Sequence, residues 1–160
     1  MRISVDKLAA KYQENVFRAA FSICRNPEDA EDVVQDTFLK YFESNRQFES
    51  EEHIKAWLLR TAINKSKNVL RTFWHRNRST FEDYMDQLSF QEPEDQEILE
   101  AVMSLPEAYR IVIYLYYYED YPVKDIAQVL EKPENTIKSH LYRARKTLKD
   151  ILKEDWTDDE

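Results

Sequence analysis

The sequence predicts an all-α fold made of two small helical domains that are joined by a flexible acidic linker. The 160-residue chain contains no glycine, which argues against βαβ nucleotide-binding folds and Gly-rich phosphate loops. Apolar residues recur at helical spacing through most of the chain, but over residues 77–96 their density falls and acidic residues accumulate. We therefore expect one domain over residues 1–76, a linker over 77–96 and a second domain over 97–160.

The composition also excludes several classes of site. One cysteine and three widely separated histidines leave no disulfide framework and no zinc ligand set. No Ser, His or Cys constellation supports nucleophilic catalysis, so we expect no cofactor and no enzymatic activity. Cys24, on an apolar helix face, is interpreted as a buried structural thiol rather than a redox sensor. No apolar run approaches the ~20 residues of a membrane span, and the signal-peptide pattern is missing, so we expect a cytoplasmic protein with no membrane insertion.

Charge is distributed unevenly along the chain, whose formal net charge is −8. Residues 53–80 carry seven basic side chains and no acidic one, and residues 132–149 carry six basic side chains against one acidic. Residues 81–107, between them, carry nine acidic side chains and no basic one. Two separate basic blocks are typical of contacts with a phosphate backbone, although either block alone is also compatible with a solvated surface.

The first domain is predicted to contain helices over residues 8–24, about 27–43 and about 53–72. Asn26 and Pro27 form a helix-start signal, because Asn caps free N–H groups and Pro is tolerated in the first turn. The apolar positions that follow at helical spacing are Ala30, Val33, Val34, Thr37, Phe38, Tyr41 and Phe42. A polar connector around Phe48 joins the second predicted helix to the third.

The predicted helix over 27–43 has an outer face that mixes acidic residues with a leucine. Its members are Asp32, Gln35, Asp36, Leu39 and Glu43. An apolar residue among carboxylates is compatible with a protein-docking patch. The alternative is a solvated acidic face with one stray leucine.

The predicted helix over 53–72 has a mixed face opposite its apolar half. Its members are Trp57, Arg60, Asn64, Lys67, Asn68 and Arg71. Cations suit phosphates, an indole suits base stacking and amides suit base edges, so this face indicates binding of single-stranded nucleic acid. Alternatively, Trp57 belongs to the margin of the core.

The second domain is predicted to end in a helix-turn-helix, with helices over about 95–104, 106–119, 123–130 and 134–152. Ile126, Ala127 and Leu130 are predicted to form the inner face of the third of these helices. The last helix carries an apolar stripe formed by Ile137, Leu141, Ala144, Leu148 and Leu152. Its opposite face includes Asn135, Lys138, Ser139, Tyr142, Arg143, Lys146 and Lys149. A cationic, hydrogen-bonding helix face fits the major groove of DNA.

The turn of this motif departs from the common pattern. Glu131 stands where glycine is frequent, and a left-handed conformation there costs a residue with a Cβ about 1 kcal/mol. Asn135 replaces a second common glycine. The alternative to a helix-turn-helix is a basic surface helix in a generic bundle.

Several motifs in order resemble bacterial alternative sigma factors of the extracytoplasmic-function (ECF) group in the sigma-70 family. Residues 29–38 (DAEDVVQDTF) resemble the polymerase-binding signature of region two, and residues 56–64 (AWLLRTAIN) resemble its promoter-melting helix. Residues 105–110 (LPEAYR), with 125–130 and 136–145, resemble region four. The resemblance spans about residues 8–153.

The resemblance implies a role for each group of residues. The residues that would meet the β′ clamp helices of core RNA polymerase are Asp32, Gln35, Asp36, Phe38 and Leu39, with Phe38 acting mainly by holding its helix in place. Phe48 and Asn64 would help to form the pocket for a flipped −10 base, and the residues that would line the adjoining strand path are Trp57, Lys67, Asn68 and Arg71. Those assigned to the −35 element are Thr136, Lys138, Ser139, Tyr142, Arg143 and Lys146.

The resemblance also implies partners and a function. The partners are core RNA polymerase, through the β′ clamp helices and the β flap, promoter DNA and an anti-sigma factor. The implied function is that of a promoter-specificity subunit that recognises −35 and −10 elements and promotes DNA melting. Two rivals remain from the residues alone. A stand-alone helix-turn-helix regulator would bind operators without polymerase, and a helical adaptor would bind only protein.

Overall fold

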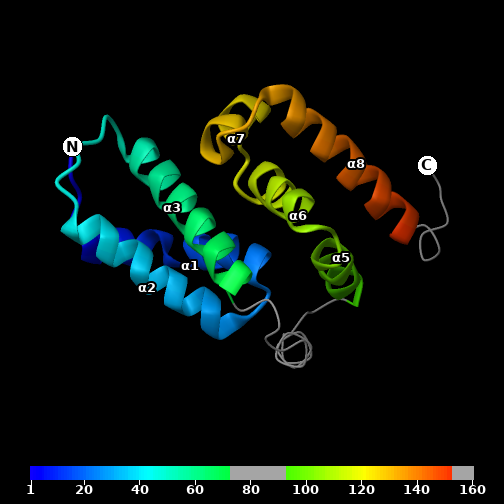
Figure 1. Ribbon diagram of the computed structural model, residues 1–160, viewed down its shortest axis with the longest axis horizontal. Helices are drawn as coiled ribbons and strands as arrows, with labels where there is room; N and C mark the ends of the chain where they lie inside the picture. The colour runs from blue at the N-terminus through cyan, green and yellow to red at the C-terminus, as the bar shows by residue number, and fades with distance from the viewer. Residues whose placement is uncertain (73–92, 153–160) are drawn as a thin grey trace. The chain divides into compact units, whose positions relative to one another are not determined.

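The computed structural model describes residues 1–72 and 93–152, and these residues contain helices and no strand. The chain divides into two compact units, Met1–Phe81 and Glu82–Glu160 (Figure 1). The prediction of an all-α fold with two helical domains is therefore confirmed. Most of the predicted linker, residues 77–92, lies outside the described residues.

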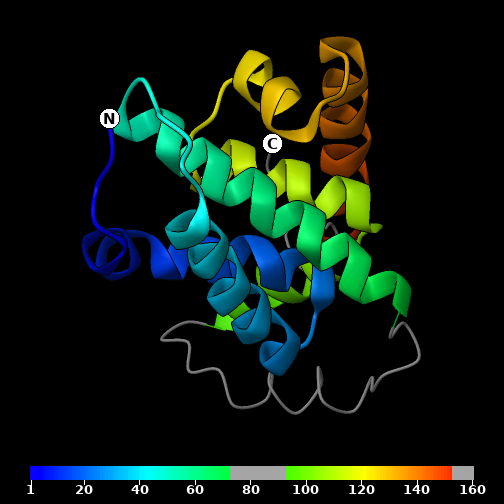
Figure 2. The same ribbon diagram turned by 60° about the vertical axis from the view of Figure 1, so that its left-hand side comes forward.

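The first unit is built from α1 (Val5–Cys24), α2 (Pro27–Glu43) and α3 (Glu51–Thr72). Helix α1 packs against both α2 and α3, and α2 also contacts α3 (Figures 1 and 2). The predicted start of α2 is confirmed, because the Asn26 side chain accepts a hydrogen bond from the backbone N–H of Asp29 at 2.9 Å. The third helix begins two residues earlier than predicted.

The core of the first unit follows the predicted apolar faces, with one correction. Residues that are at most 1% exposed include Leu8, Val16, Ile23, Val33, Tyr41, Ile54, Leu58, Leu59 and Ile63. Phe42, placed by the sequence on the apolar face of α2, is instead 66% exposed. At about 100° per residue, Phe42 lies about 120° from Ala30, whereas the buried Tyr41 lies about 20° from it. Phe42 therefore falls outside the arc that faces α1 and α3.

Cys24 is buried in this core, as predicted. Its Sγ atom lies 4.0 Å from the backbone oxygen of Ser66 in α3. The thiol therefore packs between two helices.

Among residues 1–72 and 93–152, none of the helices combines the length and the apolar character that a membrane span requires.

The second unit contains α5 (Pro93–Met103), α6 (Glu107–Ile113), a π-helical turn η1 (Tyr114–Tyr118), α7 (Val123–Leu130) and α8 (Glu134–Leu152). Helix α5 begins two residues before the predicted start, at a proline, which is tolerated in a first helical turn. The single helix predicted over residues 106–119 is divided into α6 and η1. Its register changes because the Glu119 N–H reaches back five residues to the Tyr114 carbonyl, at 3.3 Å.

Helices α7 and α8 have the predicted bounds and form the predicted helix-turn-helix (Figure 1). The apolar stripe of α8 is buried at Ile137, Leu141 and Ala144, and half-buried at Leu148 and Leu152. On α7, the structure adds one residue to the predicted inner face.

Val129 is buried on the inner face of α7 together with Ile126 and Ala127, whereas Leu130 is only half-buried. Leu130 is the last residue of α7, and Glu131 caps the helix. Glu131 adopts the expected left-handed conformation, with φ 57° and ψ 48°. Asn135 lies inside α8 and does not have a positive φ.

Candidate nucleic-acid interface

The predicted single-strand face lies along α3, but its residues differ in accessibility. Asn64 and Asn68 are exposed, and Trp57, Arg60 and Lys67 are half-buried. Arg71 lies in the last turn of α3, and its side chain lies outside the described part. The exposed amides and the partly accessible indole and cations give α3 the chemistry for binding unpaired bases and phosphates.

Trp57 belongs both to the surface and to an aromatic cluster. Its ring meets the rings of Tyr41 and Phe48 edge-on, with centroids 6.1 Å and 5.8 Å away. Because the residue is only half-buried, the indole is supported on one side and accessible on another. The two alternatives left open by the sequence are thus combined in one residue.

Phe48 lies inside this cluster and is only 3% exposed. Its ring stacks on Tyr41 at 5.9 Å and meets His53 edge-on at 5.1 Å. Phe48 therefore presents no free ring face, and any contribution to a base pocket is as a supporting wall. His53, which sequence reasoning missed, also accepts a hydrogen bond from the Glu49 N–H through Nδ1, at 3.1 Å.

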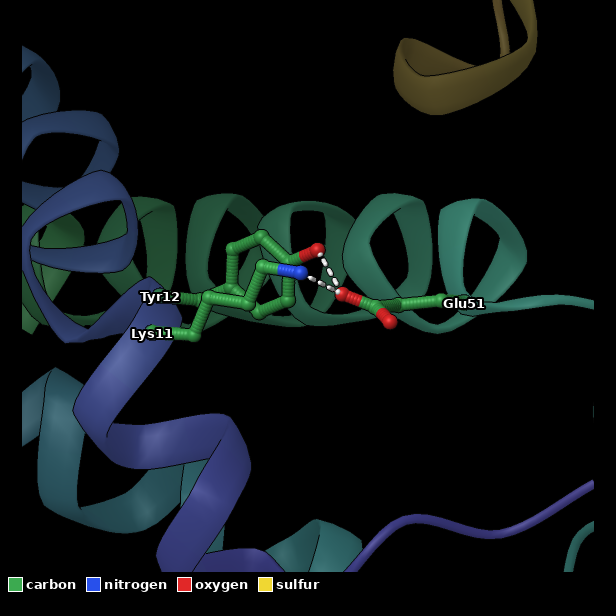
Figure 3. A network of polar contacts seen from close by, with 3 residues as sticks. All are labelled: Lys11, Tyr12 and Glu51. Carbon is green, nitrogen blue, oxygen red and sulfur yellow. Dashed lines mark hydrogen bonds and ion pairs between the residues drawn. The ribbon is translucent and has the colours of Figure 1, made fainter.

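The first turn of α3 is anchored to α1 by a polar network. One oxygen of Glu51, Oε2, accepts hydrogen bonds from the Lys11 ammonium and from the Tyr12 hydroxyl (Figure 3). These two hydrogen bonds, first Lys11 and then Tyr12, lower the pKa of Glu51 below its ordinary value. The carboxylate thus fixes the start of the helix that carries Trp57.

We expect Glu51→Gln to destabilise the first unit at neutral pH and to have little effect in acid. Because the folded-state pKa is depressed, the stabilising contribution of Glu51 is present above its unfolded pKa, near 4.5, and is lost as the pH falls through the folded value. Urea unfolding of both proteins at a series of pH values measures this difference. Glu52→Gln, at an exposed neighbour, is the control, and a difference that does not change with pH would contradict the assignment.

The outer face of α2 is exposed as predicted. Asp32, Gln35 and Asp36 are exposed, and Leu39 is 53% exposed. Phe38 is only 7% exposed, so it packs inside the first unit and does not belong to this exposed face. The exposed Phe42, one helical turn after Leu39, adds an aromatic ring that the sequence had assigned to the core.

On α8, the predicted groove face is largely accessible. Lys138, Arg143 and Lys146 are exposed, and Tyr142 is 65% exposed. Thr136 and Ser139 are half-buried. Cations, hydroxyls and one aromatic ring on a single helix are suited to phosphates and to base edges in the major groove.

Arg145, a cation of the same helix, is held by the π-helical turn. Its Nε atom donates a hydrogen bond to the Tyr117 hydroxyl at 2.7 Å, and its guanidinium lies 5.1 Å from the Tyr116 ring centroid. The hydrogen bond to Tyr117 raises the pKa of Arg145. The sequence could not reveal this contact, because it joins residues 28 positions apart and depends on the register of η1.

The chain matches the family model for Sigma-70 region 2 over residues 8–76 and that for Sigma-70, region 4 over residues 95–148. The RNA polymerase sigma factor SigV of Bacillus subtilis (strain 168) is 31% identical over 151 residues, which cover 90% of this chain and 89% of SigV. The ECF RNA polymerase sigma factor SigM of the same strain is 28% identical over 156 residues, covering 92% and 94%.

Two solved structures have a similar fold. The sigma factor RpoE, in complex with the anti-sigma factor NepR from Bartonella quintana, has a TM-score of 0.72 and 24% identity, over 94% of this chain and 98% of RpoE. CnrH, in complex with the cytosolic domain of CnrY, has a TM-score of 0.69 and 24% identity, over 95% and 89%.

The two family models match the two helical units in chain order, and this arrangement is that of a sigma factor. The chain belongs to the sigma-70 family of RNA polymerase sigma factors, in its ECF group. Its function is that of an alternative sigma factor in transcription initiation.

Proposed function

We propose that the outer face of α2 docks this chain on core RNA polymerase, and that α3 and α8 then act on the −10 and −35 elements of a promoter. The observation that carries the proposal is the placement of Leu39 and Phe42, two large apolar side chains exposed on the helix that resembles the polymerase-binding signature. An exposed apolar pair rimmed by carboxylates is suited to a protein partner, here the β′ clamp helices.

The proposed role of α3 is to hold the displaced strand of the −10 element. Asn64 hydrogen-bonds an unpaired base, Trp57 stacks with a neighbouring base, and Lys67, Asn68 and Arg71 follow the backbone. Phe48 supports the ring of Trp57 from within the first unit. Support comes from the accessibility of Asn64 and Asn68 and from the ring contacts of Trp57.

The proposed role of α8 is to bind the −35 element in the major groove. Lys138 and Arg143 contact phosphates or guanine, and Tyr142 contacts a thymine methyl or a sugar. Thr136, Ser139 and Lys146 add backbone contacts, while the β flap holds the second unit on the polymerase. The exposure of the cations on a helix with a buried inner stripe supports this role.

The formal net charge of −8 explains why docking on core polymerase must precede promoter binding. Each basic face neutralises only a few phosphates, so the free chain is expected to bind DNA weakly and with strong salt dependence. Docking on core polymerase turns the second DNA contact into an intramolecular one at high effective concentration.

We propose a cytoplasmic protein without catalytic activity of its own, because its work is binding and strand separation. The solved neighbours RpoE and CnrH are each in complex with a partner, which for RpoE is described as an anti-sigma factor. We propose a similar partner here that covers the apolar pair of α2.

Run-off transcription tests the proposed function. Core polymerase with this chain is expected to start transcripts at defined sites in a library of random promoter fragments, and core polymerase alone is not. The rival reading, a stand-alone regulator, predicts sequence-specific DNA binding without polymerase and no start-site selection.

We expect Asn64→Ala to lower open-complex formation by about tenfold, because a pocket hydrogen bond to an unpaired base is lost. Affinity for core polymerase should stay unchanged. Permanganate reactivity of promoter thymines measures melting, and Gln13→Ala, which removes an exposed amide from α1, is the control. Equal losses in melting and core binding would contradict the assigned pocket.

A further inference from the structure

The first residues of the chain lie against the connector between α2 and α3, residues 44–50 (Figure 1). The Phe48 N–H donates to the Met1 carbonyl at 3.3 Å, and the Met1 amino group donates to the Phe48 carbonyl at 2.9 Å. The same amino group donates to Oε1 of Gln47 at 3.1 Å. Residues 1–3, the N-terminal segment, therefore pair with the part of the connector that carries Phe48.

Arg2 joins this connector to the end of α2. Its Nη1 donates to the Arg46 carbonyl at 3.2 Å, and its Nη2 donates to the Tyr41 carbonyl, also at 3.2 Å. The guanidinium carbon lies 4.3 Å from the centroid of the Tyr41 ring. A planar fork can bridge two carbonyls and stack on a ring at once, and a cation is favoured beside the carbonyls at a helix C-terminus.

Ile3 completes the attachment through the Tyr41 hydroxyl. This hydroxyl accepts a hydrogen bond from the Ile3 N–H at 3.0 Å and donates one to the Ile3 carbonyl at 2.7 Å. The ring of Tyr41 is also the one that contacts Phe48 and Trp57. The N-terminal segment and the accessible indole are thus connected through a single buried ring.

We propose that the N-terminal segment positions the connector and Trp57 for the melted −10 strand, with Arg2 as the positioning residue. The inference rests on the proposed function of α3, and it adds a segment outside the helices that carry the DNA-binding side chains. Arg2 acts through Tyr41 and Arg46 and makes no contact with DNA. Without it, the connector keeps its hydrogen bonds to Met1 and the ring contacts of Phe48, but it loses the bridge between the Arg46 carbonyl and the end of α2.

The test uses the full chain bound to core polymerase on a promoter that it transcribes. Arg2→Ala is expected to lower open-complex formation by about five- to tenfold, less than the full loss of a hydrogen bond to a charged group, because Arg2 is exposed and acts on the strand only through Tyr41 and the connector. Core affinity, the −35 footprint and the salt dependence of promoter binding should stay unchanged. Arg2→Lys should remain impaired, because an ammonium lacks the planar fork that bridges both carbonyls while stacking on the ring.

A second measurement does not depend on transcription. In a chain whose other tryptophans are replaced (Trp74→Phe and Trp156→Phe), Arg2→Ala is expected to increase quenching of Trp57 fluorescence by acrylamide, while Lys7→Ala, an exposed cation of α1, leaves it unchanged. Equal quenching of Arg2→Ala and its parent would overturn the proposal.

The outcomes also separate this proposal from the function on which it rests. If Trp57→Ala abolishes melting while Arg2→Ala melts the promoter normally, the positioning role is wrong and the proposed function stands. If Arg2→Lys restores melting fully and Arg2→Ala lowers the salt slope by about one, Arg2 contacts a phosphate directly and the proposal is overturned. If the unaltered chain opens no promoter, the proposed function itself fails.

Discussion

The double variant Leu39→Ser, Phe42→Ser is expected to bind core RNA polymerase about 100-fold or more weakly than the unaltered chain does. Large apolar side chains at the centre of an interface commonly contribute 2 kcal/mol or more each, and ~1.4 kcal/mol corresponds to a tenfold change in affinity. Because the two side chains are 53% and 66% exposed, the substitution removes little from the core of the first unit. The melting temperature should therefore change little.

Fluorescence anisotropy with labelled chain and core polymerase measures this loss. Ile151→Ser, which removes an exposed apolar side chain from α8, is the control and should bind as the unaltered chain does. If the Leu39 and Phe42 variant binds core polymerase with an affinity within twofold of that of the unaltered chain, the chain docks through another surface.

The second large effect is expected at α8. Replacing Lys138 and Arg143 with alanine should weaken binding of the polymerase complex to −35 DNA by about 100-fold, because each specific contact to a base is worth about 1–3 kcal/mol. The two exposed cations lie on the helix face opposite the buried stripe, so the helix itself should remain folded.

Salt dependence identifies the kind of contact that is lost. If both side chains contact phosphates, the slope of log affinity against log salt should fall by about two. Lys7→Ala with Arg18→Ala removes two exposed cations from α1 and serves as the control. If the −35 footprint and the salt slope are both unchanged, Lys138 and Arg143 do not contact the DNA.

The elements predicted best from the sequence are those defined by local signals. The bounds of α7 and α8 follow from a short apolar pattern, a turn and a continuous stripe, and the start of α2 follows from Asn26 and Pro27. The outer faces of α2 and α8 were predictable for the same reason, since helical spacing alone determines which residues share a face.

Features that depend on distant residues were not predictable. Phe42 is apolar and lies about 120° from Ala30 on α2, and the width of the arc that α1 and α3 cover decides that it lies outside the core. The burial of Phe48 depends on Tyr41, Trp57 and His53 together. The contact between η1 and Arg145 joins residues 28 positions apart, so no local signal in the sequence predicts it.

These contacts change how the predicted sites are understood. Phe48 is buried against Trp57, so we propose that it contributes to the base pocket by supporting that ring, and we add the exposed Phe42 to the proposed docking face of Leu39. Arg145, although it lies in the basic block of α8, is engaged by tyrosines of the same unit. Arg145 is accordingly left out of the proposed DNA contacts of α8, which are Thr136, Lys138, Ser139, Tyr142, Arg143 and Lys146.

The most direct test is the association of the purified chain with core RNA polymerase, measured by co-elution in size-exclusion chromatography and by a binding titration. We expect a stoichiometric complex. This complex should bind promoter DNA specifically, whereas neither component should do so alone. A chain that stays separate from core polymerase at micromolar concentration, yet binds a specific DNA site by itself, would contradict the account.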